Sequence, residues 1–171
     1  MPIAVAAAIV TFWPFHLDSG RFAERLRLSK VLMNRGDYGQ AAMELEKAHG
    51  LEPGDTTVEF NLGMALVAQG RAQDGLAHMR RAVDDGVPIK GARYALAGAL
   101  QATGDSAGAA SLLRTFSPLP DEDAESCYQV ALVAIDAKAP DVAERYLKRA
   151  IELRPDFTAA EQELARLRNA R

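Results

Sequence analysis

The stretch NLGMALVAQG, residues 61–70, contains positions that return every 34 residues along this 171-residue chain. It closes on Gly70, and glycines stand at the same interval at Gly36 and Gly104. Each of these glycines follows one amphipathic stretch and precedes another, so each is expected to end a helix in the left-handed backbone conformation. A fixed period of this length is typical of stacked structural repeats. The sequence therefore predicts helix-turn-helix units with a turn at each glycine.

Two columns of residues support this period. The predicted first helices carry an aliphatic residue followed by a small one: Leu28 and Ser29, Leu62 and Gly63, Leu96 and Ala97, and Val130 and Ala131. The predicted second helices carry a small residue and then a large apolar one, a helical turn later: Ala41 and Leu45, Gly75 and Met79, Ala109 and Leu113, and Ala143 and Leu147. Small residues in both columns allow the two helices of a pair to approach closely. Four helix pairs in register are expected.

This pattern resembles that of the tetratricopeptide repeat, over four repeats between Arg21 and Pro155. The nearest matches are residues 61–70 and 143–155, and Pro53 and Pro155 stand where the family closes its second helix. The chain departs from the family at two columns. Lys138 replaces the fourth turn glycine, and the bulky residue of the first helix is replaced by Arg25, Glu59, Arg93 and Cys127.

The resemblance implies an all-α fold, a right-handed α-solenoid of four helix-turn-helix repeats. Stacked repeats leave an apolar face at the end of the array, which a terminal helix must cover. We therefore predict three segments: an apolar N-terminal segment at residues 1–20, the repeats at 21–155 and a capping helix at 156–171. Ser117 to Pro120 includes two prolines, which cannot continue a helix, so a kink is expected there.

Composition argues against several functions. The net charge of -3 and the pI near 5.6 disfavour a nucleic-acid partner, because phosphate binding needs clustered basic residues. Neither a phosphate-binding glycine loop nor a nucleophile or zinc motif occurs, so no catalysis, cofactor or metal is expected. The histidines, at 16, 49 and 78, lack the spacing of a helical metal site. Cys127 is interpreted as a small core residue.

Met1 to Leu17 contains no Asp, Glu, Lys or Arg and includes Trp13 and Phe15. It is short for a membrane span, which needs about 20 apolar residues. Three interpretations stay open: membrane insertion or attachment through Met1 to Phe15, a helix packed on the repeats or on a partner chain, and a boundary within a longer protein. If this segment bound the groove of a second copy, the chain would form a homo-oligomer. Membrane association is the predicted localisation, with the cytoplasm as the alternative.

Stacked helix pairs curve, and the first helices line the concave side that such proteins use for binding. The resemblance implies which first-helix positions face this groove. The predicted partner-binding residues are Lys30, Phe60, Asn61, Met64, Tyr94, Tyr128, Gln129 and Leu132. Their apolar and aromatic side chains suit an apolar or amphipathic segment of another polypeptide, and the two amides suit its backbone.

The predicted function is a non-catalytic protein–protein interaction scaffold that binds a peptide or helix in its groove. The alternative is a membrane-anchored structural or assembly subunit of a larger membrane complex, or the soluble tail of a longer membrane protein. Neither interpretation names the partner, because one repeat architecture serves unrelated processes.

Overall fold

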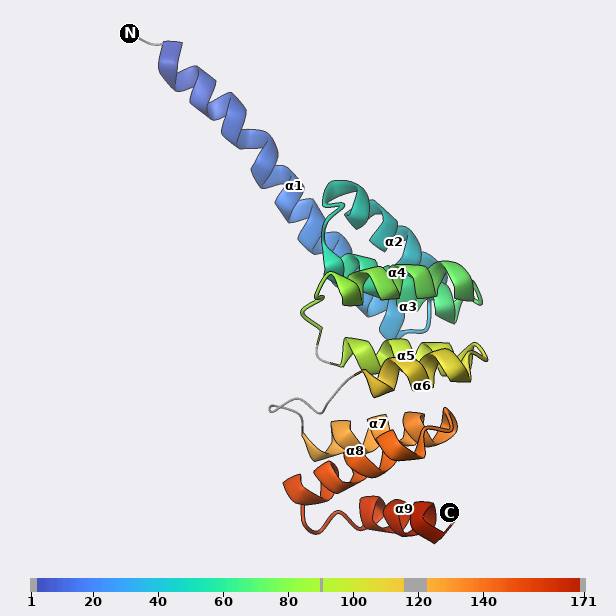
Figure 1. The fold of residues 1–171 in the computed structure, drawn as a ribbon. Coiled ribbons are helices and arrows are strands. Elements are labelled where there is room, and N and C mark those ends of the chain that lie inside the picture. Colours follow the sequence, from blue (N-terminus) through green and yellow to red (C-terminus); the bar gives the residue numbers. More distant parts are fainter. Residues whose placement is uncertain (1–2, 90, 116–122, 170–171) are drawn as a thin grey trace. The chain divides into compact units, whose positions relative to one another are not determined.

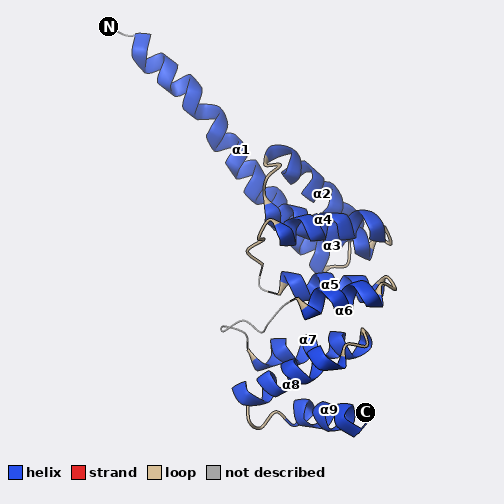
Figure 2. Cartoon of the chain, in the orientation of Figure 1, coloured by secondary structure: helices blue, strands red, loops and turns tan. Residues whose placement is uncertain are grey.

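The computed structural model describes residues 3–89, 91–115 and 123–169, with side chains from Ser19 onward. Within these ranges the secondary structure is entirely helical (Figure 2). The helices, labelled in Figure 1, are α1 (Ile3–Asn34), α2 (Tyr38–Leu51), α3 (Thr56–Ala68), α4 (Ala72–Asp84), α5 (Ala92–Ala102), α6 (Ser106–Arg114), α7 (Ala124–Asp136), α8 (Pro140–Leu153) and α9 (Thr158–Asn169). The all-α fold of four successive helix pairs followed by a terminal helix is confirmed.

The chain divides into two compact units, and each is described by itself. Unit 1 is Met1–Ile89 and holds the pairs α1–α2 and α3–α4. Unit 2 is Lys90–Arg171 and holds the pairs α5–α6 and α7–α8 with α9.

The predicted turns form as expected, because the residue after each first helix takes a positive φ. Gly36, Gly70 and Gly104 have φ of 77°, 85° and 90°. In each turn the next amide reaches back to a carbonyl in the helix, as in Asp37 N to Leu32 O at 2.9 Å, which satisfies a carbonyl that the helix end leaves open. Aspartates then start several helices, with Asp55 and Asp123 accepting from the amides of Val58 and Ser126 at 2.8 and 2.7 Å.

In unit 1, α2 packs between its own first helix and the first helix of the next repeat. Its buried Ala41, Leu45 and Ala48 lie in one core cluster with Leu62 and Leu66 of α3. Partly buried side chains of α1, among them Phe22, Leu26 and Met33, pack against this cluster. The small-residue columns meet where α3 contacts α4.

Gly63 and Gly75 make that contact unusually close. A Cβ added to Gly63 would lie 2.6 Å from the Gly75 carbonyl oxygen, and one added to Gly75 would lie 2.5 Å from the Gly63 carbonyl oxygen. The second repeat carries glycine at both positions, so its two backbones approach more closely than side chains would allow.

In unit 2, α8 supplies the largest part of the core, with Val142, Tyr146 and Leu147 all fully buried. Cys127 is also buried, as predicted for a small core residue. The terminal helix α9 packs on α8 and buries Ala160 and Leu164. The position of α9 agrees with that of a capping helix.

The beginning of the chain is continuous with the first repeat. α1 is a single helix from Ile3 to Asn34, so the predicted boundary after residue 20 lies within a helix. Over the described residues, no helix has both the length and the apolar character needed to cross a bilayer. The division into three segments and the membrane contact of Met1 to Phe15 stay predictions, and the predicted kink at Ser117 to Pro120 lies outside the described residues.

Candidate functional site

The predicted partner-binding residues belong to the first helices of both units. Lys30 of α1 and Asn61 and Met64 of α3 lie in unit 1, and Lys30 and Met64 are exposed. Phe60 is 1% exposed, so its side chain belongs to the core and offers no surface to a partner in this structure. An aromatic residue at this column therefore serves packing in the second repeat.

Unit 2 carries the other four residues on two first helices that pack against each other, α5 and α7. We call these four residues, Tyr94, Tyr128, Gln129 and Leu132, the aromatic face. Gln129 is exposed, while the two tyrosines and Leu132 are half-buried. The face thus combines apolar surface with an accessible amide.

The tyrosines of the aromatic face are held in place by the second helix and by the turn that follows it. The Tyr94 hydroxyl lies 3.1 Å from that of Tyr146 in α8, and their rings meet edge to face with centroids 5.8 Å apart. The Tyr128 ring packs on Phe157, which precedes α9, at a centroid distance of 5.0 Å. Rings fixed in this way lose little conformational freedom when a ligand binds.

Polar groups border the same face. Gln129 donates from Nε2 to Glu125 Oε1 at 3.1 Å, and Arg154 lies 3.9 Å from Glu125 Oε2. The Arg154 guanidinium also lies 4.3 Å from the centre of the Phe157 ring, within the range of a cation–π contact. Aromatic and aliphatic surface with a polar border is suited to binding a polypeptide segment.

Comparison with known proteins agrees with this architecture. The family model of the tetratricopeptide repeat matches residues 124–157, which include α7, α8 and their turn. This segment is a tetratricopeptide repeat. No curated protein sequence matches the chain.

Solved structures of low sequence identity share the fold. The pilF protein of Pseudomonas aeruginosa superposes with a TM-score of 0.68 at 18% identity, over 88% of this chain and 68% of that one. MamA from Desulfovibrio magneticus RS-1, residues 41 to the end, gives 0.65 at 18% identity, over 86% and 83%. YrrB, described as a TPR protein with an unusual peptide-binding site, gives 0.61 at 22% identity, over 86% and 76%.

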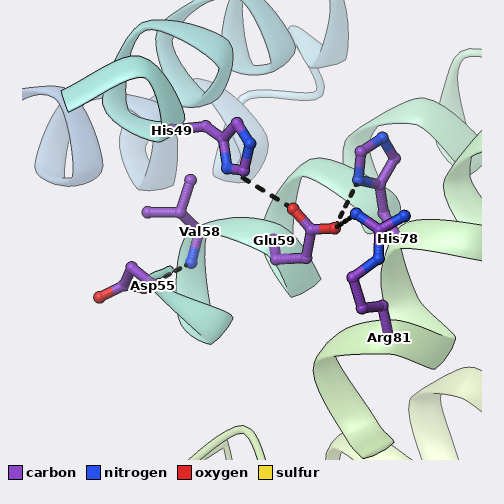
Figure 3. A network of polar contacts seen from close by, with 6 residues as sticks. All are labelled: His49, Asp55, Val58, Glu59, His78 and Arg81. Carbon is purple, nitrogen blue, oxygen red and sulfur yellow. Dashed lines mark hydrogen bonds and ion pairs between the residues drawn. The ribbon is translucent and has the colours of Figure 1, made fainter. Parts of the chain in front are cut away.

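In the second repeat, Glu59 stands in place of the bulky first-helix residue, and it is buried. Figure 3 shows the carboxylate between three helices. Arg81 Nη1 donates to Oε1 at 2.7 Å, and His78 Nδ1 lies 3.0 Å from the same oxygen, both from α4. His49 Nδ1 of α2 faces Oε2 at 3.6 Å. These contacts link α3 to α2 and to α4.

The first repeat uses the same three positions, with the acid and the basic residue exchanged at the first two and a basic residue kept at the third. Arg25, Glu44 and Lys47 lie 34 residues before Glu59, His78 and Arg81. Arg25 Nη1 and Lys47 Nζ donate to Glu44 at 2.5 and 2.7 Å. These hydrogen bonds, that from Lys47 first, lower the pKa of the Glu44 carboxyl below its ordinary value against the opposing effect of burial.

The first two repeats thus each have a polar network at these positions. Metal-ligand spacings in the sequence do not reveal the Glu59 network, because its members come from three helices and lie 10 to 22 residues from Glu59. A 34-residue comparison of charged positions would have found it. In the described ranges, no three His, Cys, Asp or Glu side chains are placed to hold a metal ion, and the Arg81 cation shares the Glu59 oxygen that His78 contacts.

Proposed function

We propose that this chain is a non-catalytic scaffold that binds an apolar or amphipathic segment of another polypeptide on the aromatic face of unit 2. The observation that carries this proposal is the pair of packed first helices, α5 and α7, which present Tyr94, Tyr128 and Leu132 beside the exposed amide of Gln129. The rings offer apolar contact area, and the amide has donor and acceptor atoms for a peptide backbone.

The fold supports a polypeptide as the ligand. Tetratricopeptide-repeat proteins bind other polypeptides, and YrrB, which shares this fold, is described as having a peptide-binding site. In unit 1, Lys30, Asn61 and Met64 occupy the corresponding first-helix positions.

Leu132 is the most informative position to change. Tyr94 and Tyr128 contact Tyr146 and Phe157, so their removal would mix a loss of binding with a loss of stability. Leu132→Lys places a charge on the half-buried part of the face. The matched control is Leu153→Lys, since Leu153 is an exposed apolar residue of the same unit but lies at the end of the second helix α8.

The experiment selects peptides from a displayed library on the immobilised full chain and measures one selected peptide by isothermal titration calorimetry. We expect selected sequences rich in aromatic and aliphatic residues. Leu132→Lys should weaken binding about tenfold or more, which corresponds to about 1.4 kcal/mol, while Leu153→Lys changes it little. Failure to enrich any peptide, or equal weakening by both variants, would refute the proposal.

A further inference from the structure

The outer face of α1 carries exposed apolar residues at positions that are buried in the second repeat. Leu28 is 38% exposed, whereas its counterparts Leu62 and Val130 are 4% and 2% exposed. Val31 is 36% exposed, whereas its counterpart Ala65 is fully buried. Neither difference follows from residue type, because all five are apolar.

The covering element explains the difference. In unit 1, Leu62 and Ala65 of α3 lie in one cluster with Ala41, Leu45 and Ala48 of α2, the second helix of the preceding repeat. On the N-terminal side of Leu28, the described chain continues as the same helix, α1, which begins at Ile3. Within unit 1, no second helix therefore occupies the position over Leu28 and Val31 that α2 occupies over α3.

We propose that this face, defined by Leu28 and Val31, is a docking site for one amphipathic helix of another polypeptide, which packs on α1 as α2 packs on α3. The apolar stripe of that helix resembles that of α2, with small residues and leucine at the contact. This docking site is different from the aromatic face of unit 2, and the proposal does not rest on binding at that face.

Charge indicates the polar side of the docked helix. Where α2 meets α3, His49 faces the buried carboxylate of Glu59. The counterpart of Glu59 on α1 is Arg25, which is paired with Glu44 of α2 but keeps 40% of its side chain exposed. The exposed charged residues that share this face of α1, at helical spacing from Leu28, are the basic Arg21 and Arg35 and the acidic Glu24. An acidic residue at the position of His49, on a helix with acidic flanks, is complementary to this face.

The chain itself supplies the probe. It is a fluorescently labelled peptide of residues 37–52, which comprises helix α2 and its capping Asp37. His49→Glu in this peptide places an acid opposite Arg25. Gly39→Ala and Gly50→Ala raise its helix propensity. Fluorescence anisotropy measures its binding to the full-length protein. Two control peptides carry Leu45→Lys, which disrupts the apolar stripe, or lysine in place of His49, which reverses the charge.

We expect saturable binding that both control peptides lose. The double variant Leu28→Glu with Val31→Glu should weaken it at least about tenfold, and circular dichroism should show an unchanged fold because both side chains are more than a third exposed. Met43→Glu, a change at an exposed apolar residue elsewhere in unit 1, should leave binding unchanged.

Three results would overturn the proposal. One is the absence of saturable binding, and another is binding that the double variant leaves intact. The third is a wild-type dimer in sedimentation velocity that the double variant converts to a monomer, because a second copy of the chain would then cover this face.

Discussion

Lys138 lies in the turn of the fourth repeat with a φ of 55°, in the left-handed region that the other three repeats reserve for glycine. The backbone hydrogen bonds of the turn are kept, with Ala139 N donating to Ala134 O at 2.8 Å. A side chain with a Cβ is strained in this conformation, because Cβ approaches the following carbonyl oxygen. The fourth turn therefore forms at a cost in free energy that the other three avoid.

Lys138→Gly should relieve this strain. Part of the gain is offset, because glycine also gives the unfolded chain more freedom, and we expect a net increase of about 0.5–1 kcal/mol in the free energy of unfolding. Guanidinium unfolding followed by circular dichroism measures it. Lys138→Ala, which removes the charge but keeps the Cβ, is the control and should bring no such gain. Equal stabilisation by both variants would show that the lysine side chain, not the backbone, is unfavourable.

Glu44 links the stability of the first repeat to pH. Hydrogen bonds from Lys47 and Arg25 lower the pKa of its carboxyl below the ordinary value of 4.5. A carboxyl that is more acidic in the folded state stabilises it above that ordinary value, and this stability is lost as the pH falls through the lower folded value. Glu44→Gln should therefore be less stable than the wild type at pH 7, and the difference should shrink below pH 4.5. Unfolding midpoints at several pH values test this, with the exposed Glu46→Gln as the control; a difference independent of pH would contradict it.

At the scale of helices, the pair α3–α4 depends on two glycines. The other three repeats carry Ser29 with Ala41, Ala97 with Ala109 and Ala131 with Ala143 at these positions, so their helices have room for a Cβ. The second repeat has Gly63 and Gly75 in contact, and a Cβ on either would meet backbone atoms closer than 3 Å. Backbone atoms cannot move aside for the added Cβ as the end of a flexible side chain can.

Gly63→Ala should destabilise the protein by about 1–3 kcal/mol, the range typical of overpacking. The same substitution at Gly98, where nothing lies within 4 Å of an added Cβ, should stabilise it by about 0.5–1 kcal/mol, because alanine is the better helix former. Denaturant unfolding of the two variants gives opposite signs if the close contact is the cause. A gain at both sites would mean that the helices separate without penalty.

The helices and turns could be predicted from sequence because their signals are local and periodic. Gly36, Gly70 and Gly104 marked three turns, and the 34-residue columns paired the helices. The Glu59 network could not be found by short-range spacing, since His49, His78 and Arg81 approach the carboxylate only once three helices pack. The burial of Phe60 was also missed, because a column shared by four repeats does not have the same exposure in each.

For the whole molecule, the repeat architecture makes the terminal helix important. In a repeat array the terminal repeat lacks one neighbour, so an uncovered end exposes apolar surface. α9 packs on α8 and buries Ala160 and Leu164 there. Deleting residues 156–171 should expose apolar surface around Leu147 and Ile151 of α8, lower the melting temperature and promote self-association. Calorimetry and sedimentation velocity measure both effects, and a truncated chain that melts and sediments as the full chain does would show that α9 is no cap.

The proposed binding of a polypeptide by the first helices is tested most directly by hydrogen exchange of the full chain with and without a peptide selected on it. Bound peptide should slow amide exchange in α5 and α7 near Tyr94, Tyr128 and Leu132, because these helices present the aromatic face. α6 should change little. Protection confined to the second helices, with α5 and α7 unchanged in the saturated complex, would contradict the account.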